Sequence, residues 1–188
     1  ADINKFPAGM SAMAEKIHAA GYRAGLWLAP FAAERSSRLY QEHQDWFLKV
    51  DQENWFCGSN WSGYYALDLD HKEVQEYIRK VMDRVLNVWG FDLVKLDFLF
   101  AAAPFGNAKE TRAGKMIRAM KFIREACGNK LILGCGTPVM PAFGYTDYCR
   151  IGTDVSLDWD DKMYMRLLHR ERISTKNAVG NIVARREL

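Results

Sequence analysis

Apolar residues along the 188-residue chain alternate between helical spacing and short continuous runs. A first helix face is marked by Met10, Met13, Ala14 and Ile17. Gly21 follows this face and is typical of a helix C-terminus. The compact apolar run at 23–30, RAGLWLAP, then predicts a buried strand.

The same succession of helix and strand returns in the middle of the chain. A second helix face is predicted by Val74, Tyr77, Ile78, Val81, Val85 and Trp89. Asp70 fits its N-cap, with Glu73 three residues later as a capping box, and Gly90 fits its end. The run 91–100, FDLVKLDFLF, is apolar on both sides of a lysine and a carboxylate, which predicts a strand buried on both faces.

The last third of the chain continues the alternation. A third helix face, ended by Gly128, is predicted by Met116, Met120, Ile123 and Cys127. Strands are expected at 131–136 and at 147–155, the second running into a turn. A final helical segment is marked by Trp159, Met163, Leu167 and Leu168.

Residues 31–70 are the least regular part. We expect a short helix around 39–48 and then a Trp/Gly/Asn/Ser-rich loop at 51–65, a setting in which binding groups are common. Asp68, Asp70 and His71 together suggest a metal site, but the N-cap interpretation of Asp70 is the stronger one.

Strands that alternate with crossing helices predict an α/β fold with a parallel sheet and right-handed connections. No Gly-x-Gly-x-x-Gly or phosphate loop follows a strand, which argues against a nucleotide-binding fold. Instead, chemical groups follow successive strands: Trp27, then Lys95 and Asp97, then Cys135, then Arg150 and Asp154. Groups at the carboxyl ends of successive strands are typical of a (β/α) barrel active site.

Composition narrows the class of protein. The chain is 49% hydrophobic and 13% aromatic, as expected of a folded globular protein. Its net charge of +3 is scattered, and the basic residues at 166–172 fit a solvated helix face, so we expect no nucleic-acid partner. No apolar run approaches the roughly 18 residues of a membrane span. The chain starts at Ala1 rather than Met, which leaves an upstream leader or domain open.

The four cysteines, at 57, 127, 135 and 149, lack C-x-x-C spacing. They predict neither a zinc site nor a disulfide framework. A reducing compartment, the cytoplasm, fits this usage best.

Lys95 and Asp97 can be interpreted in two ways. One interpretation is a structural ion pair at a strand end, and the other is a site in which each residue has a ligand, because burial without a partner would cost several kcal/mol. Two carboxylates on separate strand ends, each near a cation, are what glycoside hydrolysis needs. Lys95 would favour the ionised form of Asp97, whereas Asp154 would have to hold a proton, and Arg150 would oppose this unless substrate occupied it.

Four motifs in order carry a resemblance to a known family: GLWLAPF at 25–31, KLDF at 95–98, LGCG at 133–136 and RIGTD at 150–154. Together they resemble the α-galactosidases of glycoside hydrolase family 36, the melibiase group. The resemblance implies retaining, double-displacement hydrolysis of terminal α-galactosyl groups, as in melibiose and raffinose, without a metal or organic cofactor. Such enzymes hold their two carboxyl groups about 5 to 5.5 Å apart.

The resemblance also implies a role for each residue. Asp97 matches the nucleophile and Asp154 the general acid/base. Lys95 matches a residue that hydrogen-bonds sugar hydroxyls, and Arg150 one that contacts the sugar near the reacting carbon. Trp27 and Cys135 match positions lining the galactose pocket, although Cys135 is equally explained as a buried core thiol.

The chain departs from the family in what it lacks. The sequence predicts only strands three to six of the family's barrel. Residues 177–185 resemble the helix that leads to the seventh strand. The expected fold is therefore a partial TIM-type barrel, with residues 1–188 forming a single internal fragment of a catalytic (β/α)8 domain. Its accessory β-domains and an upstream paired-aspartate motif are missing.

Two unpaired sheet edges and an apolar interior face predict self-association, for example of two half barrels that complete one. Because strands are missing, the isolated fragment is expected to have little or no activity by itself. Alternative functions are a related α-glycosidase or galactosyl transferase, or a non-catalytic sugar-binding or scaffold half barrel.

Overall fold

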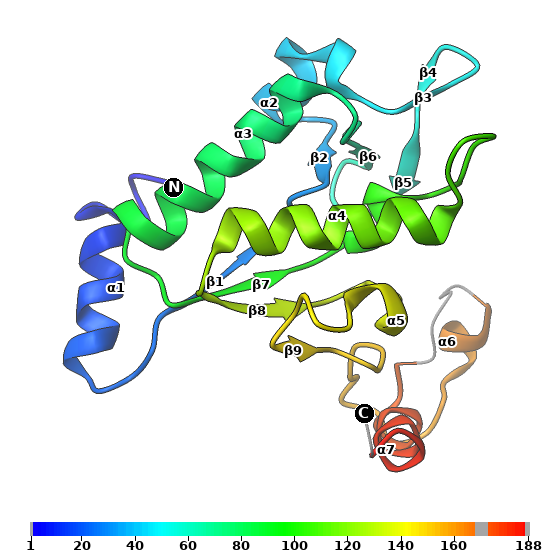
Figure 1. Cartoon of the computed structure of the whole chain (residues 1–188). Coiled ribbons are helices and arrows are strands. Elements are labelled where there is room, and N and C mark those ends of the chain that lie inside the picture. The colour runs from blue at the N-terminus through cyan, green and yellow to red at the C-terminus, as the bar shows by residue number, and fades with distance from the viewer. Residues whose placement is uncertain (1, 168–172, 187–188) are drawn as a thin grey trace. The chain divides into compact units, whose positions relative to one another are not determined.

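A parallel sheet organises the protein, whose computed structural model describes residues 2–167 and 173–186. The chain forms two compact units, 1–149 and 150–188. The sheet lies in the first unit and has the strand order β1-β7-β8-β9 (Figure 1). Its strands are β1 (Gly25–Leu28), β7 (Leu93–Leu96), β8 (Leu131–Gly134) and β9 (Tyr148–Cys149). The predicted α/β fold with four parallel strands is confirmed.

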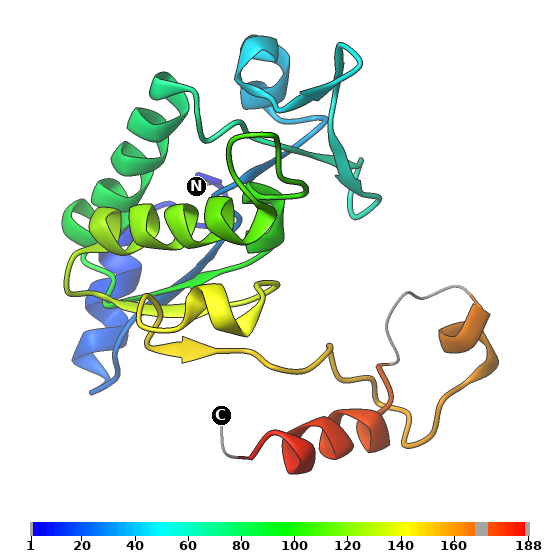
Figure 2. The same cartoon turned by 45° about the vertical axis from the view of Figure 1, so that its right-hand side comes forward.

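Two amphipathic helices cover one face of this sheet. They are α3 (Lys72–Asp83) and α4 (Arg112–Cys127), which pack side by side in both views (Figures 1 and 2). Val94 and Leu96 of β7 are buried on the helix side, while Lys95 on the other face is half-buried. The expectation that this strand is buried on both faces is therefore wrong, because α3 and α4 cover only the face that Val94 and Leu96 enter.

The ends of the helices follow from local sequence. The first helix, α1 (Gly9–Ala19), ends just before Gly21, whose φ of +82° suits a residue without a Cβ. α3 continues into a π-helical turn, η2 (Arg84–Val88). α4 begins at Thr111, whose hydroxyl accepts a hydrogen bond from the Gly114 N–H at 3.1 Å.

The predicted N-cap of α3 is wrong. His71, not Asp70, occupies that position, and it makes no side-chain cap. Asp70 instead forms an ion pair with Arg118 of α4 at 2.6 Å, and Glu73 accepts from the indole N–H of Trp46 at 3.0 Å. Tertiary partners therefore draw both carboxylates away from the helix N-terminus.

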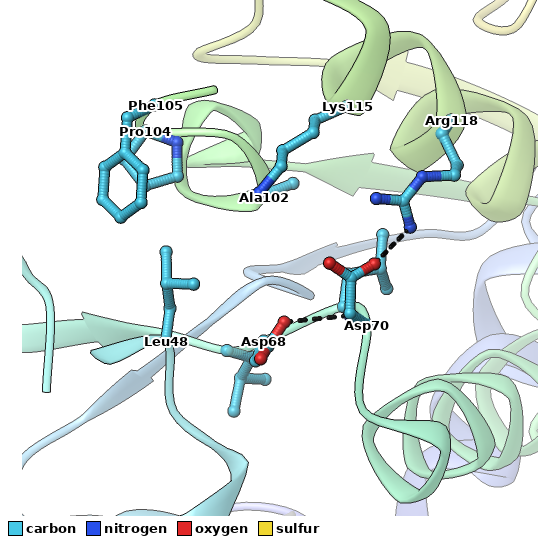
Figure 3. Close-up of a pocket in the computed structure, with 10 residues that line it drawn as sticks. Leu48, Asp68, Asp70, Ala102, Pro104, Phe105, Lys115 and Arg118 are labelled. Carbon is cyan, nitrogen blue, oxygen red and sulfur yellow. Dashed lines mark hydrogen bonds and ion pairs between the residues drawn. The ribbon is translucent and has the colours of Figure 1, made fainter. Parts of the chain in front are cut away.

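Figure 3 shows the hollow around this ion pair, between the loop before α3 and the start of α4. Asp68 accepts a hydrogen bond from the Asp70 N–H at 2.9 Å, and Lys115 points into the hollow from α4 (Figure 3). The hollow has a volume of about 10 Å³, which is room for about one water molecule. It is too small to bind a sugar.

Residues 31–70 contain more strand than the sequence predicts. A three-stranded antiparallel sheet has the order β2-β6-β5, with strands β2 (Ala32–Glu34), β5 (Phe56–Gly58) and β6 (Tyr64–Ala66). A two-stranded ribbon is formed by β3 (Lys49–Val50) and β4 (Glu53–Asn54). The helix expected at 39–48 is the short α2 (Arg38–Glu42) followed by the 3₁₀ turn η1 (Gln44–Trp46). Such short strands carry too few alternating positions to be recognised from sequence.

Two further short helices follow strand ends in the first unit. They are the 3₁₀ helix η3 (Leu99–Ala102) and α5 (Val139–Ala142). The main hydrophobic core lies between the sheet and its helices. Its largest fully buried side chains include Phe31, Ile78, Met82, Phe91, Leu96, Leu99, Met120, Ile123 and Ile132.

The described residues of the second unit include the helices α6 (Met163–Leu167) and α7 (Thr175–Ala184). The helix expected within 177–185 is thus present. Trp159 lies before α6 rather than in it, while Leu168 and most of the basic segment 166–172 lie outside the described residues. Ser174 caps α7 by accepting from the Asn177 N–H at 3.3 Å, and its hydroxyl donates to Asp161 at 2.7 Å.

Candidate active site

Asp97 stands at the carboxyl end of β7, where the parallel ladder fixes its position. Its N–H donates to the Leu28 carbonyl of β1 at 2.8 Å. On the other side, the Cys135 N–H donates to the Leu96 carbonyl, also at 2.8 Å. Strand pairing therefore holds the backbone of Asp97 between its two neighbouring strands.

The turn after Asp97 is strained and tightly packed. Phe98 has a left-handed backbone with φ of +53°, which is unfavourable by about 1 kcal/mol or more for a residue with a Cβ. Its N–H donates to Asp97 Oδ1 at 2.8 Å. Gly136, with φ of +62°, lies so close that an added Cβ would sit 3.2 Å from the Phe98 nitrogen. The turn after β8 thus supports the turn that presents the carboxylate.

Trp27 orients the other oxygen of this carboxylate. Its indole N–H donates to Asp97 Oδ2 at 3.1 Å. Trp27 and Lys95 are register partners on adjacent strands, and Trp27 as a residue is 42% exposed, which is high for a tryptophan. The structure therefore brings Trp27, Lys95 and Asp97 together at the carboxyl-terminal edge of the sheet, where the strands end.

An aromatic cluster of Trp27, Trp61, Tyr64 and Phe98 surrounds this edge. Phe98 lies 6.3 Å from Trp27, 5.5 Å from Trp61 and 4.8 Å from Tyr64, measured between ring centroids. Trp61 comes from the segment between β5 and β6, and Tyr64 is the first residue of β6, in a region where the sequence predicts only an aromatic loop. That composition is a signal for binding, but no periodicity shows that the loop folds back to β7.

Lys95 is half-buried on the same face of the sheet as Trp27. Among the residues that the structure describes, none forms a hydrogen bond or ion pair with its ammonium group. The structural pairing of Lys95 with Asp97 that the sequence left open is therefore not formed. The ammonium group is available to a ligand.

Cys135 is fully buried, and its carbonyl accepts from the Leu99 N–H at 3.4 Å. Its backbone thus helps to hold the turn after β7. The four cysteines are thiols rather than disulfides. Burial raises the pKa of Cys57 to about 12, and that of Cys127 to about 11, so these two are unreactive at neutral pH.

Arg150 and Asp154 belong to the second unit, where they form an ion pair with each other. The strand predicted at 147–155 ends at Cys149, and both residues lie in irregular chain. The Asp154 side chain is 78% exposed. Its pairing with Asp97 as a second catalytic carboxylate stays a prediction.

The suggested metal group of Asp68, Asp70 and His71 is not assembled, because Asp70 pairs with Arg118. The described residues place His71 with Asp45 and Glu73 instead, with ligand atoms within 4.8 Å of one another. Glu73 is already hydrogen-bonded to Trp46, and the Asp45 side chain is largely exposed. This group contributes nothing to the sheet edge that carries Asp97.

The helices that the structure describes include none with the length and apolar character to cross a bilayer.

Comparison with known proteins places these residues in a family. The melibiase family model matches residues 1–123, which include Trp27, Lys95 and Asp97. The α-galactosidase TtGalA of Thermus thermophilus, solved in complex with stachyose, is 36% identical, with a TM-score of 0.82. That match covers 95% of this chain and 39% of the Thermus chain.

Curated relatives match about half of the chain. The α-galactosidase Mel36A of Lactobacillus acidophilus is 34% identical over 93 residues, which are 50% of this chain and 12% of Mel36A. α-Galactosidase 1 of Pediococcus pentosaceus is 31% identical over 96 residues, which are 51% of this chain and 13% of that protein. This chain thus spans only a small part of each relative. The melibiase family model matches more than half of the chain, and the chain belongs to the melibiase family.

Proposed function

We propose that this chain carries the nucleophile side of an α-galactosidase active site, which hydrolyses terminal α-D-galactosyl groups by double displacement with retention. The observation that carries the proposal is the position of Asp97. Backbone hydrogen bonds of the parallel sheet hold it at the carboxyl end of β7, and its carboxylate accepts a hydrogen bond from Trp27. Catalytic groups of TIM barrels occupy this end of the strands. The relatives named as α-galactosidases supply the substrate class.

In this proposal Asp97 attacks the anomeric carbon of galactose. Hydrogen bonds from the Trp27 indole and the Phe98 N–H favour the carboxylate over the protonated acid, and a nucleophile must be ionised. Attack forms an ester between Asp97 and galactose as the bond to the leaving oxygen breaks. Lys95, on the same sheet face, donates hydrogen bonds to sugar hydroxyls.

Asp154 is the proposed general acid/base. It gives its proton to the departing glycosidic oxygen, and then takes a proton from the water that hydrolyses the ester. Arg150, its ion-pair partner, would contact the sugar near the reacting carbon. Trp27 and Cys135 would line the galactose pocket. The mechanism requires no metal or organic cofactor.

We further propose that the chain is an internal piece of a (β/α)8 barrel, containing its strands three to six. The proposal is supported by its coverage of 39% of the Thermus enzyme. β1 and β9 form the two edges of the described sheet, and each offers unpaired backbone groups to another strand. The isolated chain would therefore self-associate, and a well-behaved monomer in gel filtration would argue against this.

The test is release of p-nitrophenol from p-nitrophenyl α-D-galactopyranoside. Asp97→Ala should lower turnover by about a thousandfold or more, because the covalent step loses its nucleophile. Asp83→Asn, an exposed carboxylate on α3, is the matched control and should retain full turnover. Galactose binding without turnover would favour a sugar-binding role instead. Turnover that survives in Asp97→Ala would exclude Asp97 as the nucleophile.

A further inference from the structure

We propose that Trp61 is a binding platform for the leaving-group sugar, the pyranose ring attached to galactose in an oligosaccharide. The inference rests on the proposed function, since it takes Asp97 as the point of attack. It assigns a role to a residue that lies outside the four strand-end motifs.

Trp61 is presented to solvent beside the candidate nucleophile. The residue is 59% exposed, although tryptophans usually bury most of their surface. Its ring contacts Trp27 edge-on, with centroids 6.0 Å apart, and contacts Phe98 at 5.5 Å and Tyr64 at 5.9 Å. A tryptophan held among aromatic rings with much of its own surface open is suited to receive another ring.

Hydrogen bonds made by the two residues that follow Trp61 hold its loop. The N–H and hydroxyl of Ser62 both donate to Glu34 Oε1 of β2, at 3.1 and 2.9 Å. The Arg35 N–H donates to the Gly63 carbonyl at 2.8 Å. The Ser62 hydroxyl and then its N–H lower the pKa of Glu34, so the carboxylate holds the loop at neutral pH. Ordering of the loop before ligand binding reduces the entropic cost of binding.

The contacts of Trp27 and Trp61 distinguish the positions of two sugar rings. Trp27 touches Asp97 directly, so the galactose ring, which must present its anomeric carbon to Asp97, belongs beside Trp27. Trp61 contacts the rings of Trp27 and Phe98, so we assign it to the next sugar ring along from galactose. The C–H face of a pyranose packs well on an indole, and a neutral sugar needs no charged partner there. The occupant is therefore the sugar bonded to galactose, such as the glucose of melibiose.

The experiment compares two ligands that share galactose and differ in the second ring. Binding of melibiose and of methyl α-D-galactopyranoside to the chain is measured by saturation-transfer difference NMR titration, which detects weak binding and reports each ring separately. Trp61→Ala should weaken melibiose binding by about two- to tenfold and lower the signal of the glucose protons, while methyl α-galactoside binds as before. Trp61→Tyr, which keeps an aromatic face, should restore most of the melibiose affinity.

Tyr22→Ala is the matched control, because Tyr22 is an exposed aromatic residue that precedes the amino end of β1. It should change neither affinity. An equal loss for both ligands in Trp61→Ala, or no loss for either, would overturn the platform while leaving the proposed function standing. Wild-type chain that is folded by circular dichroism and binds neither sugar would overturn the proposed function itself.

Discussion

The two ends of the parallel sheet use aspartates in different ways. At the amino ends of the strands, Asp92 and Asp147 are each tied to a neighbouring strand and to a basic side chain. At the carboxyl end, Asp97 is tied by an indole and a backbone N–H on an exposed edge. The same residue type therefore stabilises the sheet at one end and, in the proposed function, presents an oxygen for chemistry at the other, as the division of TIM barrels into a stability face and a catalytic face predicts.

The contacts at the amino end show this stabilising role. Asp92 Oδ2 accepts from the Ala24 N–H at 2.8 Å and lies 2.7 Å from His18 Nε2. Asp147 Oδ2 accepts from the Ile132 N–H at 2.7 Å and from an Arg124 guanidinium N–H at 2.6 Å. Each carboxylate thus joins the segment before one strand to the strand beside it.

The largest loss of stability is expected from Gly136→Ala at the carboxyl end. The new Cβ would sit 3.2 Å from the Phe98 nitrogen in a left-handed backbone, so the free energy of unfolding should fall by about 2–3 kcal/mol. Turnover should also fall, because the turn that holds Asp97 moves. Urea unfolding and p-nitrophenol release measure the two effects.

Gly144→Ala is the control for the backbone effect alone. Gly144 also has a left-handed φ, of +80°, but nothing lies within 4 Å of its added Cβ. It should cost about 1 kcal/mol without loss of turnover. If both alanine variants lost stability and turnover alike, close packing of Gly136 on Phe98 would not support the site.

Asp147→Ala tests the opposite end. It removes the acceptor for the Ile132 N–H and for Arg124, and because the carboxylate is about one-third exposed we expect a loss of about 1–2 kcal/mol. Turnover per folded molecule should be unchanged. A specific loss of turnover at full stability would contradict the division between the two ends.

The pH dependence of stability should reflect the amino end. Partial burial raises the pKa of Asp92, but the hydrogen bonds from His18 and the Ala24 N–H outweigh it, so the pKa lies below its ordinary value near 3.8. At Asp147, burial is likewise outweighed by the Ile132 N–H and Arg124, and its pKa is also lowered. Groups with a lowered folded pKa bind more protons when unfolded.

Their stabilisation is therefore complete above about pH 4 and is lost as pH falls through the lowered folded values. Unfolding free energies between pH 5 and pH 2 should show this decline in the wild-type chain. The double variant Asp92→Asn with Asp147→Asn should show a flatter profile. An unchanged slope would mean that other carboxylates control acid unfolding.

Helices and strands could be predicted from the sequence where their apolar residues repeat at a regular spacing. The helices α3 and α4 could be predicted because their apolar residues repeat over three or more turns. The strands β7 and β8 could be predicted because they are compact apolar runs. Trp27, Lys95 and Asp97 could be placed at strand ends for the same reason. The strand at 147–155 was overestimated, because apolar residues in an irregular segment imitate a strand over a few positions.

The antiparallel sheet β2-β6-β5 could not be predicted, because strands of three residues carry no detectable period. Trp61 was therefore visible as part of an aromatic loop but not as a neighbour of Trp27. The capping box at Asp70 and Glu73 failed for a related reason. Long-range partners, Arg118 and Trp46, compete with the local cap, and a local pattern cannot reveal them.

In the proposed mechanism, Asp97 forms a covalent bond to galactose. The most direct test is incubation with a 2-deoxy-2-fluoro galactosyl fluoride, which slows hydrolysis of the ester, followed by peptide mass spectrometry. The account predicts one added fluorogalactosyl group, located on the peptide that contains Asp97 and absent in Asp97→Asn. A label on another carboxylate, or turnover of p-nitrophenyl galactoside by a chain that never becomes labelled, would contradict it.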